Sequence, residues 1–312
     1  AGHTRLHPAA DRGSAMQVTV AKTAGFCFGV RRALELTQKS AALSPTCTLG
    51  ELIHNRQVVE ELAGQGVTVI ERPEDAPAGT AVVIRSHGVG PQVYDTLRAQ
   101  GSPVIDATCP FVKRIHQIAA EVPENGLLLL AGRREHPEVQ GILGYCRGQA
   151  LVFSSAEEMQ ELLAFLPSDG NIPVILAAQT TFSLREWEKI LFFAKKVCTN
   201  LKVFDTICRA TIERQSEAKQ LAQSADAIVV VGGLHSANTA ALAALCGSYC
   251  PTVQVETADQ LERHREALRG ARFIGITAGA STPACIIKEV QNSMSVLENN
   301  TEEMNFGELL DQ

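Results

Sequence analysis

Three cysteines, Cys27, Cys109 and Cys208, occupy the same kind of position, between a short apolar run and a segment with helical periodicity. Around two of them the sequence is nearly repeated, since 104–112 and 203–211 each contain an apolar run, an aspartate and then the cysteine. A cysteine at a helix N-terminus is favoured as thiolate by the helix dipole. Three thiolates that converge suit either a Cys₃His zinc site or an iron–sulfur cluster with one iron left open.

The chain has nine cysteines, an odd number, with no CxxC pair and no visible secretory signal. This pattern favours a cytoplasmic location with metal-binding or catalytic thiols over a disulfide framework. The remaining six cysteines are interpreted as small apolar side chains that pack in the interior, the commonest role of a free cysteine. They are Cys47, Cys146, Cys198, Cys246, Cys250 and Cys285.

Two polar loops follow each cysteine at matched intervals. Their marker residues are His54 and His87, His136 and Thr180, and His235 and Ser281. The first marker lies 27 residues after the cysteine in all three cases, and the second lies 60, 71 and 73 residues after it. In open α/β sheets, ligands gather outside the carboxyl ends of the strands. The intervals therefore predict three related α/β domains in a pseudo-threefold trefoil, with the loops facing one central site.

The periodicity of the apolar residues places these loops at the ends of strands. Strands are predicted at 17–21, 67–70, 81–84, 104–105, 127–131, 174–177, 227–231 and 273–277. Helices are predicted at 30–42, 52–63, 93–100, 111–122, 184–197, 210–222, from 239, and at 283–290. The predicted units are 16–108, 109–205 and 206–291, and strand 17–21 is a candidate member of the third unit.

Charge and hydropathy exclude several classes of protein. The 312 residues carry a formal net charge of −6 with no block rich in lysine or arginine, which argues against nucleic-acid binding by this region. No apolar run approaches the roughly 20 residues that span a bilayer. Residues 1–15 resemble a vector-encoded remnant before Met16, and 292–312 form an acidic tail or linker.

The polar loops combine imidazoles, hydroxyls and amides, with few cations apart from Arg133 and Arg134. Such loops, followed by helix N-termini, suit an anion such as a diphosphate. Their candidate binding residues are His54, Asn55, Ser86, His87, His136, Thr180, Thr181, Ser236, Asn238 and Ser281. Glu138 is a candidate proton donor beside an open metal position. On local sequence alone it equally fits a helix N-terminal glutamate after Pro137.

Taken in order, these stretches resemble the LytB-type 4-hydroxy-3-methylbut-2-enyl diphosphate reductases, from Met16 to about Val290. The stretches that carry the resemblance are GFCFGV (25–30), LIHN (52–55), RSHGV (85–89), DATCP (106–110), HPEV (136–139), QTT (179–181), DTIC (205–208), SAN (236–238) and TAGAS (277–281).

The resemblance implies one [4Fe–4S] cluster, held by Cys27, Cys109 and Cys208, with its fourth iron open to substrate. It implies that His54, His87, Ser236, Asn238 and Ser281 bind the diphosphate. It places His136, Thr180 and Glu138 around the hydroxyl end, where the last two relay protons. The implied reaction is a two-electron reductive dehydroxylation that gives isopentenyl and dimethylallyl diphosphates in the last step of the non-mevalonate pathway.

The resemblance also implies a ferredoxin- or flavodoxin-type electron donor, and the lack of long apolar runs predicts no membrane association. Ala237 departs from the pattern, because many members carry a second serine there, and we expect a modest effect on affinity. The tail 301–312 resembles the stretch that leads into RNA-binding S1-type domains in some bacterial members.

Two other functions remain open from the residues. Quinolinate synthase also uses a three-cysteine, pseudo-threefold α/β site, although its motifs do not match this sequence. The non-enzymatic alternative is a zinc-binding or redox-sensing module with three cysteines and a histidine. Metal and acid-labile sulfide analysis separates such a module from an iron–sulfur enzyme.

Overall fold

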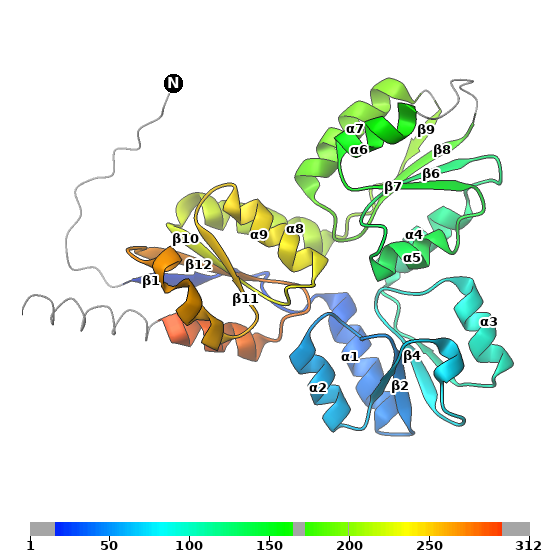
Figure 1. Cartoon of the computed structure of the whole chain (residues 1–312), viewed down its shortest axis with the longest axis horizontal. Helices are drawn as coiled ribbons and strands as arrows, with labels where there is room; N and C mark the ends of the chain where they lie inside the picture. Colours follow the sequence, from blue (N-terminus) through cyan, green and yellow to red (C-terminus); the bar gives the residue numbers. More distant parts are fainter. Residues whose placement is uncertain (1–15, 165–171, 199, 295–312) are drawn as a thin grey trace, which may run out of the picture.

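The computed structural model describes residues 16–164, 172–198 and 200–294, so the predictions for 1–15 and 295–312 lie outside it. The described residues form three four-stranded sheets, each with helices on its faces (Figure 1). All strand pairs within the three sheets are parallel. The predicted α/β class and the trefoil arrangement of three units are confirmed.

The first sheet has the order β3-β2-β4-β5. Its strands are β2 (Thr46–Leu49), β3 (Thr68–Ile70), β4 (Ala81–Ile84) and β5 (Val104–Asp106). The helices beside it are α1 (Phe28–Ala41), α2 (Arg56–Gly64), α3 (Pro91–Ala99) and the 3-10 turn η1 (Pro73–Asp75).

The second sheet has the order β7-β6-β8-β9. Its strands are β6 (Leu127–Ala131), β7 (Gln149–Phe153), β8 (Val174–Ala178) and β9 (Leu201–Val203). Its helices are α4 (Pro110–Ala120), α5 (Pro137–Leu143), α6 (Ala156–Ala164) and α7 (Leu184–Val197).

The third sheet, β11-β10-β12-β1, contains β1 (Gln17–Val20), β10 (Ala227–Val231), β11 (Thr252–Val255) and β12 (Phe273–Ala278). Its helical segments are α8 (Arg209–Ser224), α9 (Ala237–Gly247), η2 (Ala258–His264), α10 (Arg265–Leu268) and a helix over 284–294.

The three sheets share one strand order, and β1 takes in the third sheet the edge position that β5 and β9 take in the others. Each of these edge strands leads into the helix of the next unit through one cysteine. β1 leads through Cys27 into α1, β5 leads through Cys109 into α4, and β9 leads through Cys208 into α8. The cysteines therefore lie where the chain passes from one unit to the next, which places them near the pseudo-threefold axis. The unit limits read from the sequence stay a prediction.

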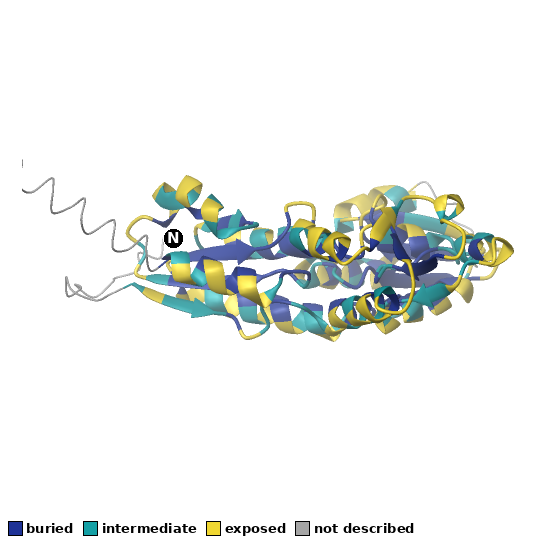
Figure 2. Ribbon diagram, turned by 90° about the horizontal axis from the view of Figure 1, so that it is seen from below, coloured by how far each residue is buried: buried dark blue, intermediate teal, exposed yellow. Residues whose placement is uncertain are grey.

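Each sheet is buried on both faces. In the second sheet, alternate residues of β6 enter two different cores, with Leu127 and Leu129 on one face and Leu128 and Leu130 on the other. Parallel strands covered by helices on both faces read as continuous apolar runs rather than alternating ones. Figure 2 shows these strands as buried bands between helices that are exposed on their outer sides.

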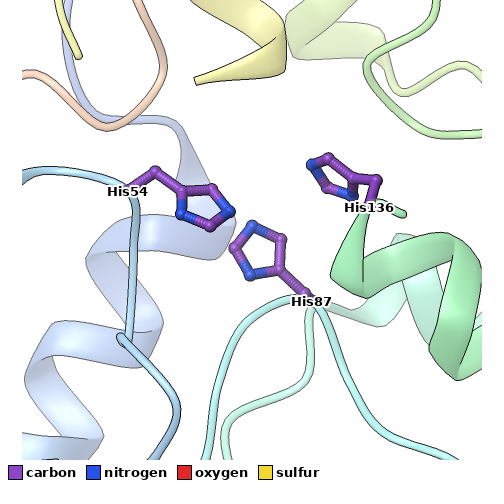
Figure 3. A group of neighbouring side chains, drawn as sticks. All are labelled: His54, His87 and His136. Carbon is purple, nitrogen blue, oxygen red and sulfur yellow. The ribbon is translucent and has the colours of Figure 1, made fainter. Parts of the chain in front are cut away.

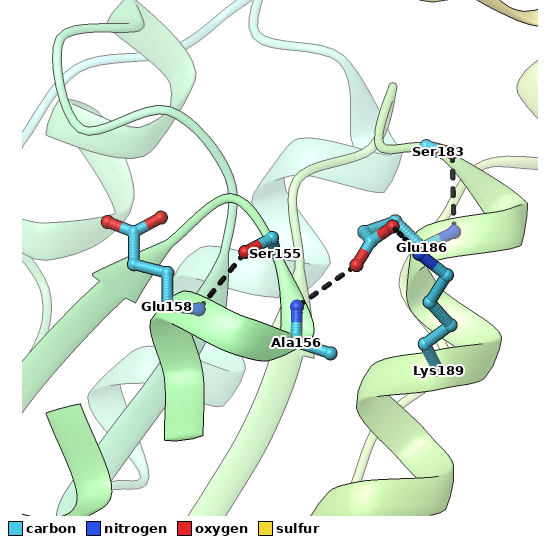
Figure 4. A network of polar contacts seen from close by, with 6 residues as sticks. All are labelled: Ser155, Ala156, Glu158, Ser183, Glu186 and Lys189. Atoms are coloured by element: carbon cyan, nitrogen blue, oxygen red, sulfur yellow. Dashed lines mark hydrogen bonds and ion pairs between the residues drawn. The ribbon is translucent and has the colours of Figure 1, made fainter. Parts of the chain in front are cut away.

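Short polar contacts fix the helices at the sheet margins. In the second unit, Ser183 Oγ caps α7 by accepting from the Glu186 amide, and Glu186 Oε1 accepts from the Ala156 amide at 3.0 Å (Figure 4). One carboxylate thus ties the start of α6 to α7, which keeps both helices over the same face of the sheet. None of the described helices has both the length and the apolar content needed to cross a membrane.

Most predicted strands and helices are present within a few residues, but one boundary is wrong. The helix predicted to begin at Leu52 begins at Arg56, because Asn55 is its N-cap and accepts from the Val58 amide at 3.1 Å. This difference leaves His54 in the loop after β2 instead of on a helix. The strands β2, β7, β9 and β11 and the helices α5, α6 and α10 were not predicted.

Candidate active site

Each of the three cysteines is the N-cap of a helix, and each is held by an equivalent backbone hydrogen bond. The Cys27 amide donates to the Ala280 carbonyl at 3.2 Å. The Cys109 and Cys208 amides donate at 3.0 Å to the carbonyls of Ser86 and Thr180. In every case the acceptor lies in a loop after a central strand of the sheet that precedes the cysteine. The trefoil thus places the three side chains, here called the cysteine triad, by the same contact three times.

The cysteine triad lines a single cavity. Gly29, in the first turn of α1, allows the close approach, because a Cβ there would lie 2.8 Å from Cys109 Sγ and 3.9 Å from Cys27 Sγ. Burial raises the pKa of Cys109 to about 11 and also raises that of Cys208, in the protein without metal. A soft metal that binds thiolate offsets this burial penalty. Convergent sulfur donors at three helix N-termini therefore fit an iron–sulfur group.

The cavity is also lined by three imidazoles, those of His54, His87 and His136, here called the histidine triad. They come from three different loops and their rings lie side by side (Figure 3). The ring centroids of His54 and His87 are 4.8 Å apart and stacked. Those of His87 and His136 are 5.4 Å apart and edge-on. The ring nitrogens that could serve as ligands lie within 4.8 Å of one another.

The charge state of the histidine triad is compatible with an anionic ligand. Burial is the main cause that lowers the pKa of all three imidazoles, that of His136 to about 3, and the nearby Arg85 guanidinium lowers them further. The free site is therefore neutral around pH 7, with a positive charge beside it. An anion gains from that charge and from ring N–H donors. The Glu51 carboxylate, 3.7 Å from His54 Nδ1, acts in the opposite direction on the pKa of His54.

His136 is oriented by its own helix. Its Nδ1 atom accepts a hydrogen bond at 3.1 Å from the amide of Glu138 at the start of α5. The neutral ring must then carry its proton on Nε2. That tautomer leaves an N–H donor for a ligand in the cavity.

Glu138 and Thr180 form a buried pair in the same cavity. Glu138 is 2% exposed. Its Oε1 and Oε2 atoms accept from the Thr180 amide and hydroxyl respectively, each at 2.7 Å. Burial raises the pKa of Glu138 to about 7, although both bonds to Thr180 act in the opposite direction. The carboxyl group is thus able to hold a proton at neutral pH, as a general acid requires.

The third unit supplies hydroxyl and amide groups to the cavity, from Ser236, Asn238 and Ser281. Ser236 is the N-cap of α9, and Ser281 Oγ donates to the His54 carbonyl at 3.4 Å. Among the described residues, Asn238 Nδ2 and His87 Nδ1 are buried without a hydrogen-bond partner. Buried polar atoms are rarely left unpaired in native proteins. Their position at the cavity fits a polar ligand.

The eleven residues that the resemblance assigns to the cluster, the diphosphate and the hydroxyl end all line this one cavity, as do Ser86 and Thr181. Asn55, also a candidate binding residue, is instead the N-cap of α2. Other sequence markers behave differently. His235, which served to measure the interval in the third unit, is exposed, and the next residue, Ser236, takes the N-cap position that His136 takes in the second unit. Of the six cysteines interpreted as interior packing residues, Cys47 and Cys246 are buried, and Cys246 lies in the core beside α8. Three others are half-buried, and for Cys285, which is exposed, the interpretation is wrong.

Sequence reasoning missed Arg214, a buried residue that lines the cavity. Its guanidinium donates to the carbonyls of Thr23 and Gly25, and so ties α8 to the loop that leads into Cys27. The periodicity of α8 contained the signal, because Arg214 shares a helix face with the buried Ala218 and Ala222. A charged residue in an apolar stripe indicates a specific partner.

Comparison with known proteins adds a family to this geometry. The model of the LytB protein family matches residues 18–295. A protein of Caldanaerobacter subterraneus subsp. tengcongensis, named 4-hydroxy-3-methylbut-2-enyl diphosphate reductase, is 40% identical over 297 residues, which are 92% of this chain and 99% of that protein. A protein of Citrifermentans bemidjiense with the same name is 40% identical over 288 residues, 91% of this chain and 99% of its own length.

Two solved structures are also similar. One is (E)-4-hydroxy-3-methyl-but-2-enyl diphosphate reductase, described as the terminal enzyme of the non-mevalonate pathway. It is 37% identical with a TM-score of 0.63, and the match covers 89% of this chain and 99% of that chain. The other, E-1-hydroxy-2-methyl-but-2-enyl-4-diphosphate reductase from Plasmodium falciparum, is 26% identical with a TM-score of 0.82 over 89% of this chain and 87% of that one. The resemblance predicted from the sequence is thus confirmed, and the chain belongs to the LytB family.

Proposed function

We propose that this chain is a 4-hydroxy-3-methylbut-2-enyl diphosphate reductase that forms isopentenyl and dimethylallyl diphosphates. The reaction takes two electrons and two protons. The allylic C–O bond breaks, the oxygen leaves as water, and one new C–H bond forms. Family membership and the names of relatives that match over nearly their whole length support this activity. The observation that carries it is that sulfur donors, an anion pocket and a protonatable carboxyl group line one cavity.

LytB-type reductases are iron–sulfur enzymes, and we propose that the cysteine triad holds one [4Fe–4S] cluster with a fourth iron free of protein ligands. When bound, such a cluster supplies the electrons one at a time and a Lewis-acidic iron for the hydroxyl end of the substrate. The donor that refills it is proposed to be a small protein of the ferredoxin or flavodoxin type.

The anion pocket is proposed to hold the diphosphate. Ring N–H groups of His54 and His87, with the groups of Ser236, Asn238 and Ser281, act as donors to its oxygens. Binding energy gained at this end positions the far end of the substrate, which is how a remote group contributes to rate. His136, with its Nε2–H free, faces the same space and orients the hydroxyl end.

Glu138 and Thr180 are proposed to move the proton that leaves with the hydroxyl. With its pKa raised to about 7, Glu138 is protonated often enough to act as an acid, and its carboxyl is hydrogen-bonded to the Thr180 hydroxyl. Thr180 can therefore pass a proton outward while Glu138 replaces it. The low exposure of both side chains excludes bulk water from this path.

The test is an anaerobic assay of the reconstituted protein with (E)-4-hydroxy-3-methylbut-2-enyl diphosphate and a reduced viologen. The expected result is isopentenyl and dimethylallyl diphosphates by mass spectrometry. Protein that contains iron and sulfide but forms neither product would overturn the proposal, and formation of quinolinate instead would identify the alternative condensing enzyme. Zinc without sulfide would point to the binding module.

A further inference from the structure

The loop that carries His87 lies against α5 along two pairs of glycines. A Cβ on Gly141 would lie 3.4 Å from the carbonyl carbon and oxygen of Gly88, and a Cβ on Gly144 would lie 2.9 Å from Gly90 Cα. These four residues are here called the glycine seam. Because the loop belongs to the first unit and α5 to the second, the seam is a direct backbone contact between units.

His116 on α4 contacts both sides of the glycine seam. A Cβ on Gly88 would lie 2.6 Å from His116 Cε1, and a Cβ on Gly141 would lie 3.4 Å from His116 Nε2. The ring stacks on Tyr145, which follows α5, with centroids 4.5 Å apart and an interplanar angle of 20°. The His116 ring, carried by α4, therefore lies between α5 and the His87 loop.

The buried ring nitrogen of His116 indicates a role other than packing. It is 5% exposed, and its Nε2 atom is buried without a hydrogen-bond partner among the described residues. Burial lowers the pKa of His116 to about 4, so the ring is neutral. An unpartnered buried nitrogen destabilises the fold. His116 also lines a separate cavity of about 370 Å³. Behind Gly88 the ring lies beside the Thr108 methyl group, since a Cβ on Gly88 would lie 2.6 Å from His116 Cε1 and 2.9 Å from Thr108 Cγ2.

We propose that His116 is a positioning residue that sets the separation between the His87 loop and the start of α5. That separation fixes how far His87 lies from His136, since His136 is the N-cap of α5. The inference rests on the proposed role of the histidine triad in binding the diphosphate. A flat five-membered ring fits behind Gly88 where a smaller side chain would leave the loop unsupported.

Two substitutions test the proposal from opposite directions. His116→Ala removes the ring that contacts both α5 and the His87 loop, which leaves the loop free to move. Gly144→Ala inserts a methyl group 2.9 Å from Gly90 Cα, and its backbone (φ −61°, ψ −21°) accepts alanine without strain. The matched control is Gly64→Ala, another helical glycine, at the end of α2, where a Cβ would have no heavy atom within 4 Å.

The measurements use the cluster-loaded protein under anaerobic conditions. They are the dissociation constant for inorganic pyrophosphate by calorimetry, kcat and KM for the substrate, iron content and the thermal midpoint. We expect His116→Ala and Gly144→Ala each to weaken pyrophosphate binding and raise KM about tenfold, the value of one charge-assisted hydrogen bond, with a smaller change in kcat. Iron content should stay as in the wild type, and Gly64→Ala should change neither constant.

A purely structural role would shift the thermal midpoint while leaving the pyrophosphate constant within twofold of the wild type, and that result would overturn the proposal. Weaker binding in His116→Ala with normal binding in Gly144→Ala would also contradict it, because both act on the same separation. If His116→Ala does not fold, Gly144→Ala alone decides. Failure of the wild type itself to bind pyrophosphate or turn over substrate would refute the proposed function instead.

Discussion

Replacing Glu138 with glutamine tests both the catalytic and the electrostatic account of this site. The glutamine side chain has the same shape, and its oxygen can still accept from the backbone amide of Thr180. In the wild type the Thr180 hydroxyl donates to Glu138, whereas in the variant the glutamine NH₂ group can donate to that hydroxyl. The pair therefore stays connected, but no proton can be supplied. We expect substrate binding and iron content to be kept and kcat to fall roughly a hundredfold or more.

The same substitution has a predicted effect on stability that depends on pH. Burial raises the pKa of Glu138 from 4.5 to about 7, so the folded state prefers the protonated form more than the unfolded state does. Its contribution to stability is complete below pH 4.5 and is lost as the pH rises through about 7. The difference between these pKa values corresponds to about 3 kcal/mol. Glutamine stays neutral at all pH values. The free energy of unfolding of the variant, relative to that of the wild type, should therefore rise by up to that amount between low pH and pH 8.

The assay compares unfolding of wild type and variant between pH 5 and 8, because the difference between them cancels most other titrating groups. The control is Glu186→Gln. Like Glu138, Glu186 accepts a partly buried hydrogen bond from a backbone amide, that of Ala156, but it lies outside the cavity. We expect the turnover of this variant to be normal. A stability difference for Glu138→Gln that is flat over this range would refute the raised pKa. Normal turnover would refute the role of Glu138 as proton donor.

Three further predictions concern the sulfur and imidazole groups. Serine in place of any member of the cysteine triad should abolish iron binding and activity, whereas Cys246→Ser should keep both, as measured by iron content and product formation; an active triad variant would contradict the assignment. Gly29→Ala, whose methyl group would lie 2.8 Å from Cys109 Sγ, should lower iron content without unfolding the chain, which circular dichroism can verify. Pyrophosphate should bind with uptake of protons, and more tightly at pH 6 than at pH 8, because an anion raises the lowered pKa values of the histidine triad. Calorimetry in buffers of different ionisation enthalpy measures this uptake. No uptake would mean that the rings stay neutral and would contradict the prediction.

The order of the units was predictable because the chain repeats one pattern. Equal intervals of 27 residues between a cysteine and the first polar loop reflect a shared strand order, in which the cysteine follows an edge strand and the loop follows a central one. The buried strands β6 and β10 were also predictable from the sequence, since five apolar residues in a row are typical of a sheet covered on both faces.

The missed elements lack such a signal. Gln149–Phe153 and Leu201–Val203 are edge strands with partly exposed residues, and their pairing depends on partners distant in the sequence. The start of α2 was misplaced because the apolar Leu52 and Ile53 continue the helical period, although both are buried in the core below the loop. There the side-chain cap at Asn55, and not periodicity, decides where the helix begins.

The sequence named the residues that line the cavity, but the electrostatics of the cavity depend on the assembled fold. The sequence places Glu138 after a proline, where an exposed N-terminal glutamate is equally reasonable. Only packing against the Thr180 loop, which lies 42 residues further along the chain, buries the carboxyl group and raises its pKa. The role of Arg214 in joining α8 to the Cys27 loop likewise depends on a contact across 189 residues.

The central claim, that three sulfur atoms from three units hold one inorganic cluster, is tested most directly by counting iron and acid-labile sulfide in the anaerobically purified protein. A [4Fe–4S] cluster predicts about four of each per chain, with the broad visible absorption of iron–sulfur proteins. Protein that is fully folded and yet carries zinc without sulfide, or no metal after reconstitution, would contradict the account.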